Sequence, residues 1–189
     1  MKAEETLESE LKIPVTDLEP VRTSLRRERA VLVQILAREI NLLLDRHDGR
    51  LRTAGSTLRL RQHGDRNLLT LKGPVSYSGA IKVRAEHETE FSDLPRMVDI
   101  FERLGFSVFM RYEKDREEWL VEQCSVVLDH TPMGDFVEVE GPPERLERVA
   151  RLLGLDAETA VRGSYVSLWL EYRELHPELD LPANMVFTE

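Results

Sequence analysis

Charged and apolar residues alternate in the segment Leu7 to Ile13, near the start of the chain. Glu8, Glu10 and Lys12 stand at every second position, so their side chains share one face if the segment is a strand. The opposite face carries Leu7, Leu11 and Ile13. One side of this strand would therefore seek an apolar layer, while the other presents carboxylates and an ammonium group at fixed spacing.

The same alternation recurs along several later segments of the chain. A single strand of this kind most often has its charged face in the solvent. Taken together, however, these segments would point their charged faces into a common interior if the sheet curls closed and helices cover its apolar side. The predicted lining comprises Glu8, Glu10, Lys12, Arg59, Arg61, Lys72, Lys82, Arg84, Glu86, Glu88, Lys114, Arg116, Asp129, Glu138 and Glu140.

These side chains belong to two chemical classes that together suit one type of ligand. Guanidinium and ammonium groups bind phosphate oxygens. Carboxylates supply hard oxygen ligands for Mg²⁺ or Mn²⁺, which take a few carboxylates together with substrate phosphates. A polyphosphate bound with divalent metal would offset both clusters of charge, so we predict a small-molecule polyphosphate as the ligand and Mg²⁺ or Mn²⁺ as the cofactor.

The elements that must position these residues follow from hydrophobic periodicity. Predicted strands cover Leu7 to Ile13, Ala30 to Asp45, Thr57 to Arg61, Leu68 to Lys72, Ile81 to Glu90, Phe106 to Arg116, Glu118 to His130 and Phe136 to Glu140. Predicted helices follow Thr16-Asp17, Ser92-Asp93, Pro142-Pro143 and Ser164. Antiparallel sheets of eight strands can close into small barrels. We therefore predict an α+β fold, an eight-stranded closed antiparallel β-barrel that forms a tunnel, with the helices packed outside.

Composition limits the class of protein. In a chain of 189 residues, 41% hydrophobic residues suffice for one core, so we expect a single domain over residues 1–189, with 176–189 as a loosely docked tail. The formal charge of −9 argues against a nucleic-acid-binding surface. The single cysteine, Cys124, fits a reducing cytoplasm, and no apolar run is long enough to span a membrane. We expect a cytoplasmic protein without membrane contact, for which assembly as a homodimer stays open.

Several short motifs occur in a fixed order along the chain. They are E-S-E-L-K at Glu8 to Lys12, L-R-L-R at Leu58 to Arg61, T-L-K-G at Thr70 to Gly73, K-V-R-A-E-H-E at Lys82 to Glu88, Y-E-K-D-R at Tyr112 to Arg116, Leu128-Asp129, and G-D-F-V-E-V-E at Gly134 to Glu140. In this order the set resembles the CYTH family, the triphosphate tunnel metalloenzymes, which includes class IV adenylate cyclases, thiamine triphosphatases and inorganic triphosphatases. The resemblance covers most of the chain up to Gly154.

The resemblance implies roles for individual positions. Glu8, Glu10 and Glu140 would hold one metal ion, and Asp129 and Glu138 would help to hold a second, with Glu86 and Glu88 contributing through water. The triphosphate would be held by Lys12, Arg59, Arg61, Lys72, Arg84, Lys114 and Arg116, with Lys82 on the same face. The residues implied to act in catalysis are Glu8, Glu10, Lys12, Lys114, Asp129, Glu138 and Glu140.

Metal-dependent hydrolysis of a triphosphate is the leading expectation, with water attacking in line and no covalent residue required. The resemblance also permits adenylate cyclase activity, in which the ribose 3′-hydroxyl attacks the α-phosphate in place of water. An alternative of another class is a non-catalytic module that binds polyphosphate or nucleotides, although such a module gains nothing from burying carboxylates without cations. Tyr165 and Trp169 are expected to be core residues of the last helix, and a helix that closes one tunnel mouth would bring Tyr165 near a substrate.

Overall fold

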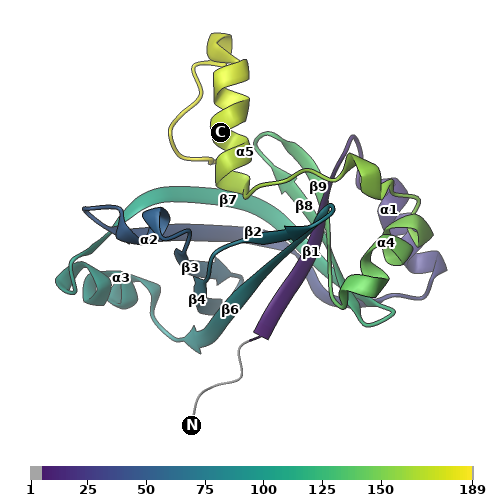
Figure 1. Cartoon of the computed structure of the whole chain (residues 1–189), viewed down its shortest axis with the longest axis horizontal. Coiled ribbons are helices and arrows are strands. Elements are labelled where there is room, and N and C mark those ends of the chain that lie inside the picture. Colours follow the sequence, from purple (N-terminus) through teal and green to yellow (C-terminus); the bar gives the residue numbers. More distant parts are fainter. Residues whose placement is uncertain (1–5, 189) are drawn as a thin grey trace.

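The chain folds into a closed antiparallel β-barrel, as the alternation of residues predicts. A computed structural model describes residues 6–188, so residues 1–5 and 189 of the expected domain lie outside the described residues. The strand order is β1-β9-β8-β7-β2-β3-β4-β6-β5, and a further pairing between β1 and β6 closes the ring, with the short β5 outside it (Figure 1). The strands are β1 (Thr6–Val15), β2 (Val31–Arg46), β3 (Thr57–His63), β4 (Arg66–Lys72), β5 (Ser76–Ser78), β6 (Ile81–Phe91), β7 (Phe106–Val121), β8 (Cys124–Thr131) and β9 (Gly134–Glu140).

The pairing register sets charged residues of neighbouring strands beside one another. Between β1 and β9, Glu10 lies opposite Glu140 and Lys12 lies opposite Glu138. Successive side chains of a strand point to opposite faces, so the intervening Leu11 points the other way. The charged faces therefore line the interior of the barrel, and the apolar faces form its outer surface.

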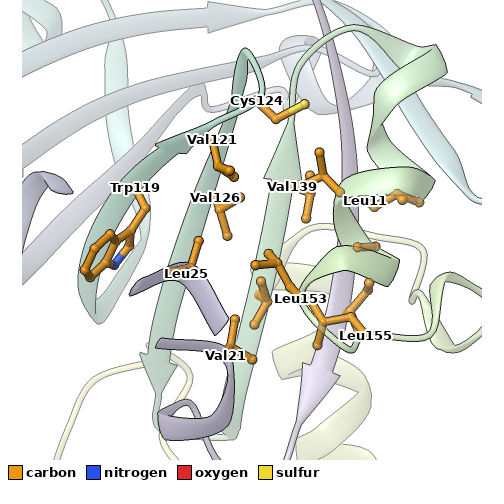
Figure 2. Close-up of a cluster of buried hydrophobic side chains, with 14 of the residues drawn as sticks. Leu11, Val21, Leu25, Trp119, Val121, Cys124, Val126, Val139, Leu153 and Leu155 are labelled. Carbon is orange, nitrogen blue, oxygen red and sulfur yellow. The ribbon is translucent and has the colours of Figure 1, made fainter. Parts of the chain in front are cut away.

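Two helices cover the outer surface on one side of the barrel, α1 (Glu19–Arg27) and α4 (Pro143–Leu152), as Figure 1 shows. Leu25 of α1 and Leu146 of α4 are fully buried against strand residues such as Val126 and Val139. Figure 2 shows these apolar side chains meeting between the strands and the helices. We call this cluster the outer core; it consists of Leu11, Ile13, Leu18, Val21, Leu25, Trp119, Val121, Cys124, Val126, Leu128, Val137, Val139, Leu146, Val149, Ala150, Leu153 and Leu155.

A second apolar cluster lies under α2 (Arg50–Thr53) and α3 (Leu94–Arg103). Leu58 and Leu60 of β3 are buried there, with Phe101 of α3 packed against them. The Asp93 side chain caps α3 by accepting a hydrogen bond from a backbone N–H of the first turn, as the predicted cap at this position requires. Helices thus cover the outer surface of the barrel at two places.

The last helix, α5 (Tyr165–Leu175), projects from one end of the barrel (Figure 1). It is preceded by the short turn η1 (Ala157–Thr159) and begins after Ser164, whose side chain accepts a hydrogen bond from a backbone N–H of the first turn. Beneath it, Tyr165 and Trp169 pack with a cluster of apolar strand residues that includes Phe136. Among the described residues, no helix combines the length and apolarity that crossing a membrane requires.

The segment after η2 (Pro177–Leu179) is packed, and the prediction of a loosely docked tail was wrong. Met185 is fully buried, its N–H donates to the carbonyl of Arg111, and its carbonyl accepts from the N–H of Glu113. The Trp169 Nε1–H also faces the carbonyls of Pro182 and Ala183, each at 3.3 Å. Backbone groups make most of these contacts, so residue types gave little sign of them.

The division between β7 and β8 also differs from the prediction. The predicted strands were Phe106 to Arg116 and Glu118 to His130, whereas β7 continues to Val121 and the chain reverses at Glu122 and Gln123. These turn residues have φ values of 49° and 65°, a left-handed conformation that usually selects glycine or asparagine. Because neither residue type is present, the turn carried no signal. The short strand β5 lies between the predicted strands Leu68 to Lys72 and Ile81 to Glu90, where no strand was predicted.

The strand predicted over Ala30 to Asp45 is confirmed as β2, but its first part is not buried. Pairing with β3 begins only at Glu39, whereas pairing with β7 extends back to Val31. The side chains of Val31, Val33 and Ile35 are 62%, 59% and 73% exposed. The start of β2 therefore extends beyond the closed part of the barrel.

Candidate active site

The barrel encloses a cavity of about 790 Å³ that is lined mainly by charged side chains. Every residue of the predicted lining except Asp129 borders it. Asp129 is fully buried in the wall beside the cavity, where it contacts Lys114 and Arg116. The alternation in separate strands thus converges on one chamber.

Three carboxylates on the wall formed by β1 and β9 make an acidic cluster. Glu8, Glu10 and Glu140 each offer one oxygen, and these oxygens lie within 4.8 Å of one another. Burial raises the pKa of Glu140 to about 8, and the negative charges of Glu138, Glu8 and Glu10 act in the same direction. Such crowding is unfavourable without a cation, and carboxylate oxygens are what Mg²⁺ and Mn²⁺ prefer. These residues therefore fit a divalent metal ion.

Two other predicted metal ligands are paired with cations instead. Asp129 accepts hydrogen bonds from Arg116 Nε at 2.7 Å and from Lys114 Nζ at 3.1 Å. Glu138 accepts from the ammonium of Lys12 and from the Arg116 guanidinium. A second metal ion on Asp129 and Glu138 stays a prediction, and it would require these cations to move.

Cations on β4 and on β6, the other neighbour of β1, are also paired with carboxylates. Lys72 Nζ lies 2.7 Å from Glu8 Oε2 and 2.8 Å from Glu86 Oε2, and Lys82 Nζ lies 2.6 Å from Glu10 Oε1. The carboxylates predicted to bind metal and the cations predicted to bind phosphate are thus paired with one another. A ligand that occupies the chamber must replace these ion pairs.

Lys12 shows how strongly the chamber favours charge. Burial alone would lower the pKa of its ammonium, but Glu138 and Glu10 outweigh that effect, and the pKa lies above its usual value. Lys12 is therefore a permanent cation in the wall, 4% exposed and paired with Glu138.

Glu39 is a buried acid in the chamber that the sequence did not single out. Its carboxylate lies 3.4 Å from Lys114 Nζ, 3.6 Å from Arg61 Nη1 and 3.9 Å from Arg116 Nε. Burial raises the pKa of Glu39, but Lys114, Arg116 and Arg61 reverse this effect and hold it well below its usual value. Glu39 therefore remains ionised and fixes the three cations around it.

The sequence contains a pattern that could have identified Glu39 as a chamber residue, but the pattern is short. Glu39 and Asn41 stand at alternate positions of β2, on the face opposite Ile40 and Leu42. The long apolar run before them hid this alternation, because it suited a strand buried on both faces.

Tyr165 reaches the chamber from α5. Its hydroxyl donates to Asp129 Oδ2 at 2.7 Å, and its ring centroid lies 4.0 Å from Lys12 Nζ and 4.7 Å from Lys114 Nζ. It also borders the cavity. Its place in an apolar cluster confirms the expectation of a core residue. Its contacts with residues of the predicted phosphate site are consistent with a position near a substrate, which stays a prediction.

Comparison with known proteins agrees with this geometry. Residues 6–165 match the sequence profile of the CYTH domain. A protein of Methanocaldococcus jannaschii, named as a proposed adenylate cyclase, is 24% identical over an alignment of 173 positions that covers 86% of this chain and 98% of that protein.

Solved structures share the barrel. That of a proposed adenylate cyclase from Vibrio parahaemolyticus has a TM-score of 0.79 at 20% identity and covers 88% of this chain and 99% of that chain. That of HpAC1 from Hippeastrum, a proposed adenylyl cyclase described as having a dominant triphosphatase activity, has a TM-score of 0.65 at 19% identity and covers 87% of this chain and 95% of that chain. At these identities the likeness establishes the fold.

Proposed function

The chain belongs to the CYTH domain family, and we propose that it hydrolyses a triphosphate inside the barrel with the help of divalent metal ions. One observation carries the proposal. The acidic cluster Glu8, Glu10 and Glu140 shares a chamber of about 790 Å³ with several lysines and arginines. Carboxylates for a metal and cations for phosphates are the two requirements of phosphoryl-transfer sites.

The residues that fit the first metal ion are Glu8, Glu10 and Glu140. When bound, Mg²⁺ or Mn²⁺ would supply positive charge to the phosphate oxygens and activate a water molecule. A second ion completes the proposal; Asp129 and Glu138 would help to hold it, with Glu86 and Glu88 as contributors through water. Binding and orienting the phosphate chain would be done by side chains of the protein.

The cations of the chamber would bind and orient the phosphate chain. Lys12, Lys114 and Arg116 are almost completely buried, so their attraction to phosphate is little screened by water. Glu39 and Asp129 hold Lys114 and Arg116 in position before a substrate arrives. Such preorganised charges stabilise negative charge that develops during phosphoryl transfer.

Adenylate cyclase activity is the second candidate, favoured by the names of the relatives from M. jannaschii and V. parahaemolyticus. The description of HpAC1 favours hydrolysis as the main reaction, since it reports dominant triphosphatase activity in a protein of this fold. We rank hydrolysis first because, among the lining residues that the structure describes, no set specifies adenine.

A product analysis tests the proposal. The protein is incubated with tripolyphosphate, ATP or thiamine triphosphate in the presence of Mg²⁺ or Mn²⁺, and the products are separated. We expect release of phosphate or pyrophosphate that a chelator abolishes. Cyclic AMP as the main product would place the cyclase first instead.

Two variants connect the reaction with the acidic cluster. Glu8→Gln and Glu140→Gln should abolish metal-dependent turnover while circular dichroism shows an intact barrel. Wild-type turnover in both variants would reject this site. Tight, metal-independent binding of tripolyphosphate without turnover would identify a binding module.

Cytoplasmic localisation and assembly as a homodimer stay predictions from the sequence.

A further inference from the structure

One carboxylate oxygen in the wall of the chamber is shared by three hydrogen-bond donors. Asp129 Oδ2 accepts from Arg116 Nη2 at 2.6 Å, from Tyr165 Oη at 2.7 Å and from Lys114 Nζ at 3.1 Å. The other oxygen, Oδ1, accepts from Arg116 Nε at 2.7 Å. All four side chains are buried, so these bonds act at low dielectric, where they influence one another strongly.

A phosphate chain in the chamber needs the same two cations that Asp129 holds. We propose that Tyr165 is a positioning residue that weakens the grip of Asp129 on Lys114 and Arg116, and thereby lets both cations bind the phosphates of the substrate. This inference rests on the proposed function. The tyrosine hydroxyl takes up part of the negative charge of Oδ2, so Asp129 competes less strongly with an incoming phosphate for its cation partners.

The aromatic ring of Tyr165 has a second effect on the cations. With Lys12 and Lys114 at 4.0 Å and 4.7 Å from the ring centroid, both ammonium groups lie within the range of cation–π attraction. The ring can hold an ammonium group without supplying a competing anion. Phenylalanine would retain this contact, so replacing the hydroxyl alone separates the two effects.

The packing of α5 fixes the direction of the hydroxyl. The Tyr165 ring meets Phe136 edge to face at 5.4 Å, and Trp169, one turn later, is 1% exposed. Trp169 is in turn held through its Nε1–H by carbonyls of the packed tail.

The test compares Tyr165→Phe with the unsubstituted protein. The first measurement is calorimetric binding of tripolyphosphate without metal, which requires no turnover, and the second is KM and kcat for tripolyphosphate with Mg²⁺. We expect Kd and KM to rise about three- to tenfold, the effect of losing one moderate hydrogen bond, while kcat changes less than about twofold. If Tyr165 had only a structural role, Tyr165→Phe would lower thermal stability without raising KM selectively over kcat.

Tyr172→Phe is the matched control, because Tyr172 lies about two turns further along α5 and stacks on Trp169. It should alter neither Kd nor KM. The effect of Tyr165→Phe should also shrink in an Asp129→Asn background, since the neutral amide competes less for Lys114 and Arg116.

Equal Kd and KM for Tyr165→Phe and the parent would overturn the inference alone. If the parent protein neither binds nor hydrolyses tripolyphosphate or the organic triphosphates, the proposed function fails, and this inference fails with it.

Discussion

On the outer face of β1, Leu11 and Ile13 have 0% and 1% of their surface exposed, and on the inner face Glu10 and Lys12 have 6% and 4%. Burial is almost equal on the two faces, yet its energetic meaning is opposite. Apolar burial stabilises the fold directly, whereas buried ions repay their lost hydration only through good pairing. The two faces of the barrel thus differ in task, because the outer core supplies stability and the chamber holds the groups that we propose for binding.

The largest expected effect is on the stability side of this comparison. Leu146→Ala removes a fully buried side chain of α4 from the outer core and should lower the free energy of unfolding by about 2–5 kcal/mol. Denaturant titration measures this loss. KM for tripolyphosphate, measured well below the unfolding temperature, should stay that of the parent, and a large change in KM would show that the two regions are coupled.

Unlike Leu146→Ala, the substitution Glu140→Gln should lower activity and raise stability. Loss of a metal ligand should lower metal-dependent turnover by about 100-fold or more, since even partners in the outer coordination shell contribute roughly 10- to 100-fold to metal affinity or activity. The metal-free variant should nevertheless be more stable than the parent, because a crowded carboxylate has been removed. A gain of about 1 kcal/mol would raise Tm by roughly 2–4 °C in a chain of this size.

The stability gain should depend on pH. The pKa of Glu140 is about 8 in the folded protein, well above the ordinary value of 4.5, so between these values the unfolded chain releases a proton that the folded state retains. Stability of the parent therefore falls as pH rises through this window, and the Glu140→Gln variant lacks this loss. Melting curves in a chelator from pH 5 to 8 should diverge, and parallel curves would contradict the assignment.

The protonation of Glu140 should also affect metal binding in the chamber. A cation on the acidic cluster displaces the proton of Glu140, so affinity for Mg²⁺ should increase with pH up to about 8, at most about tenfold per unit. Calorimetry in buffers of different ionisation enthalpy counts the released protons. An affinity independent of pH between 6 and 8 would mean that Glu140 is already ionised.

The smallest effect is expected for ions outside both regions. Arg148 pairs with Glu122 at 2.7 Å, but its side chain is 69% exposed. Arg148→Ala should change the free energy of unfolding by no more than about 1 kcal/mol, because water screens such pairs. Denaturant titration and tripolyphosphate kinetics together provide the baseline against which the buried substitutions are judged.

Much of the chamber could be predicted because its residues repeat with the period of a strand. Arg59 and Arg61 alternate with leucines, so one segment shows both faces of β3 at once. Closure of the barrel followed from the number of strands and from the helices that had to cover their apolar sides. The CYTH resemblance linked the same positions to a triphosphate and a metal.

Other parts depended on long-range contacts that residue types do not encode. Glu39 was hidden by the apolar start of β2, whose side chains turned out to be exposed. Glu122 and Gln123 reverse the chain without a turn residue, and Met185 docks through backbone hydrogen bonds. The link from Tyr165 to Asp129 joins residues 36 positions apart in the sequence and required the placement of α5.

The mutual pairing of Lys72 with Glu8 and of Lys82 with Glu10 makes the chamber an ion exchanger. A monovalent anion that bound one lysine would leave a carboxylate without its partner. A metal ion that bound the carboxylates would leave the lysines without theirs. A ligand that carries several negative charges together with its own cations satisfies both partners in one exchange. We therefore expect selectivity to follow the number of linked charges, so that orthophosphate competes poorly with a metal-complexed polyphosphate even at high concentration.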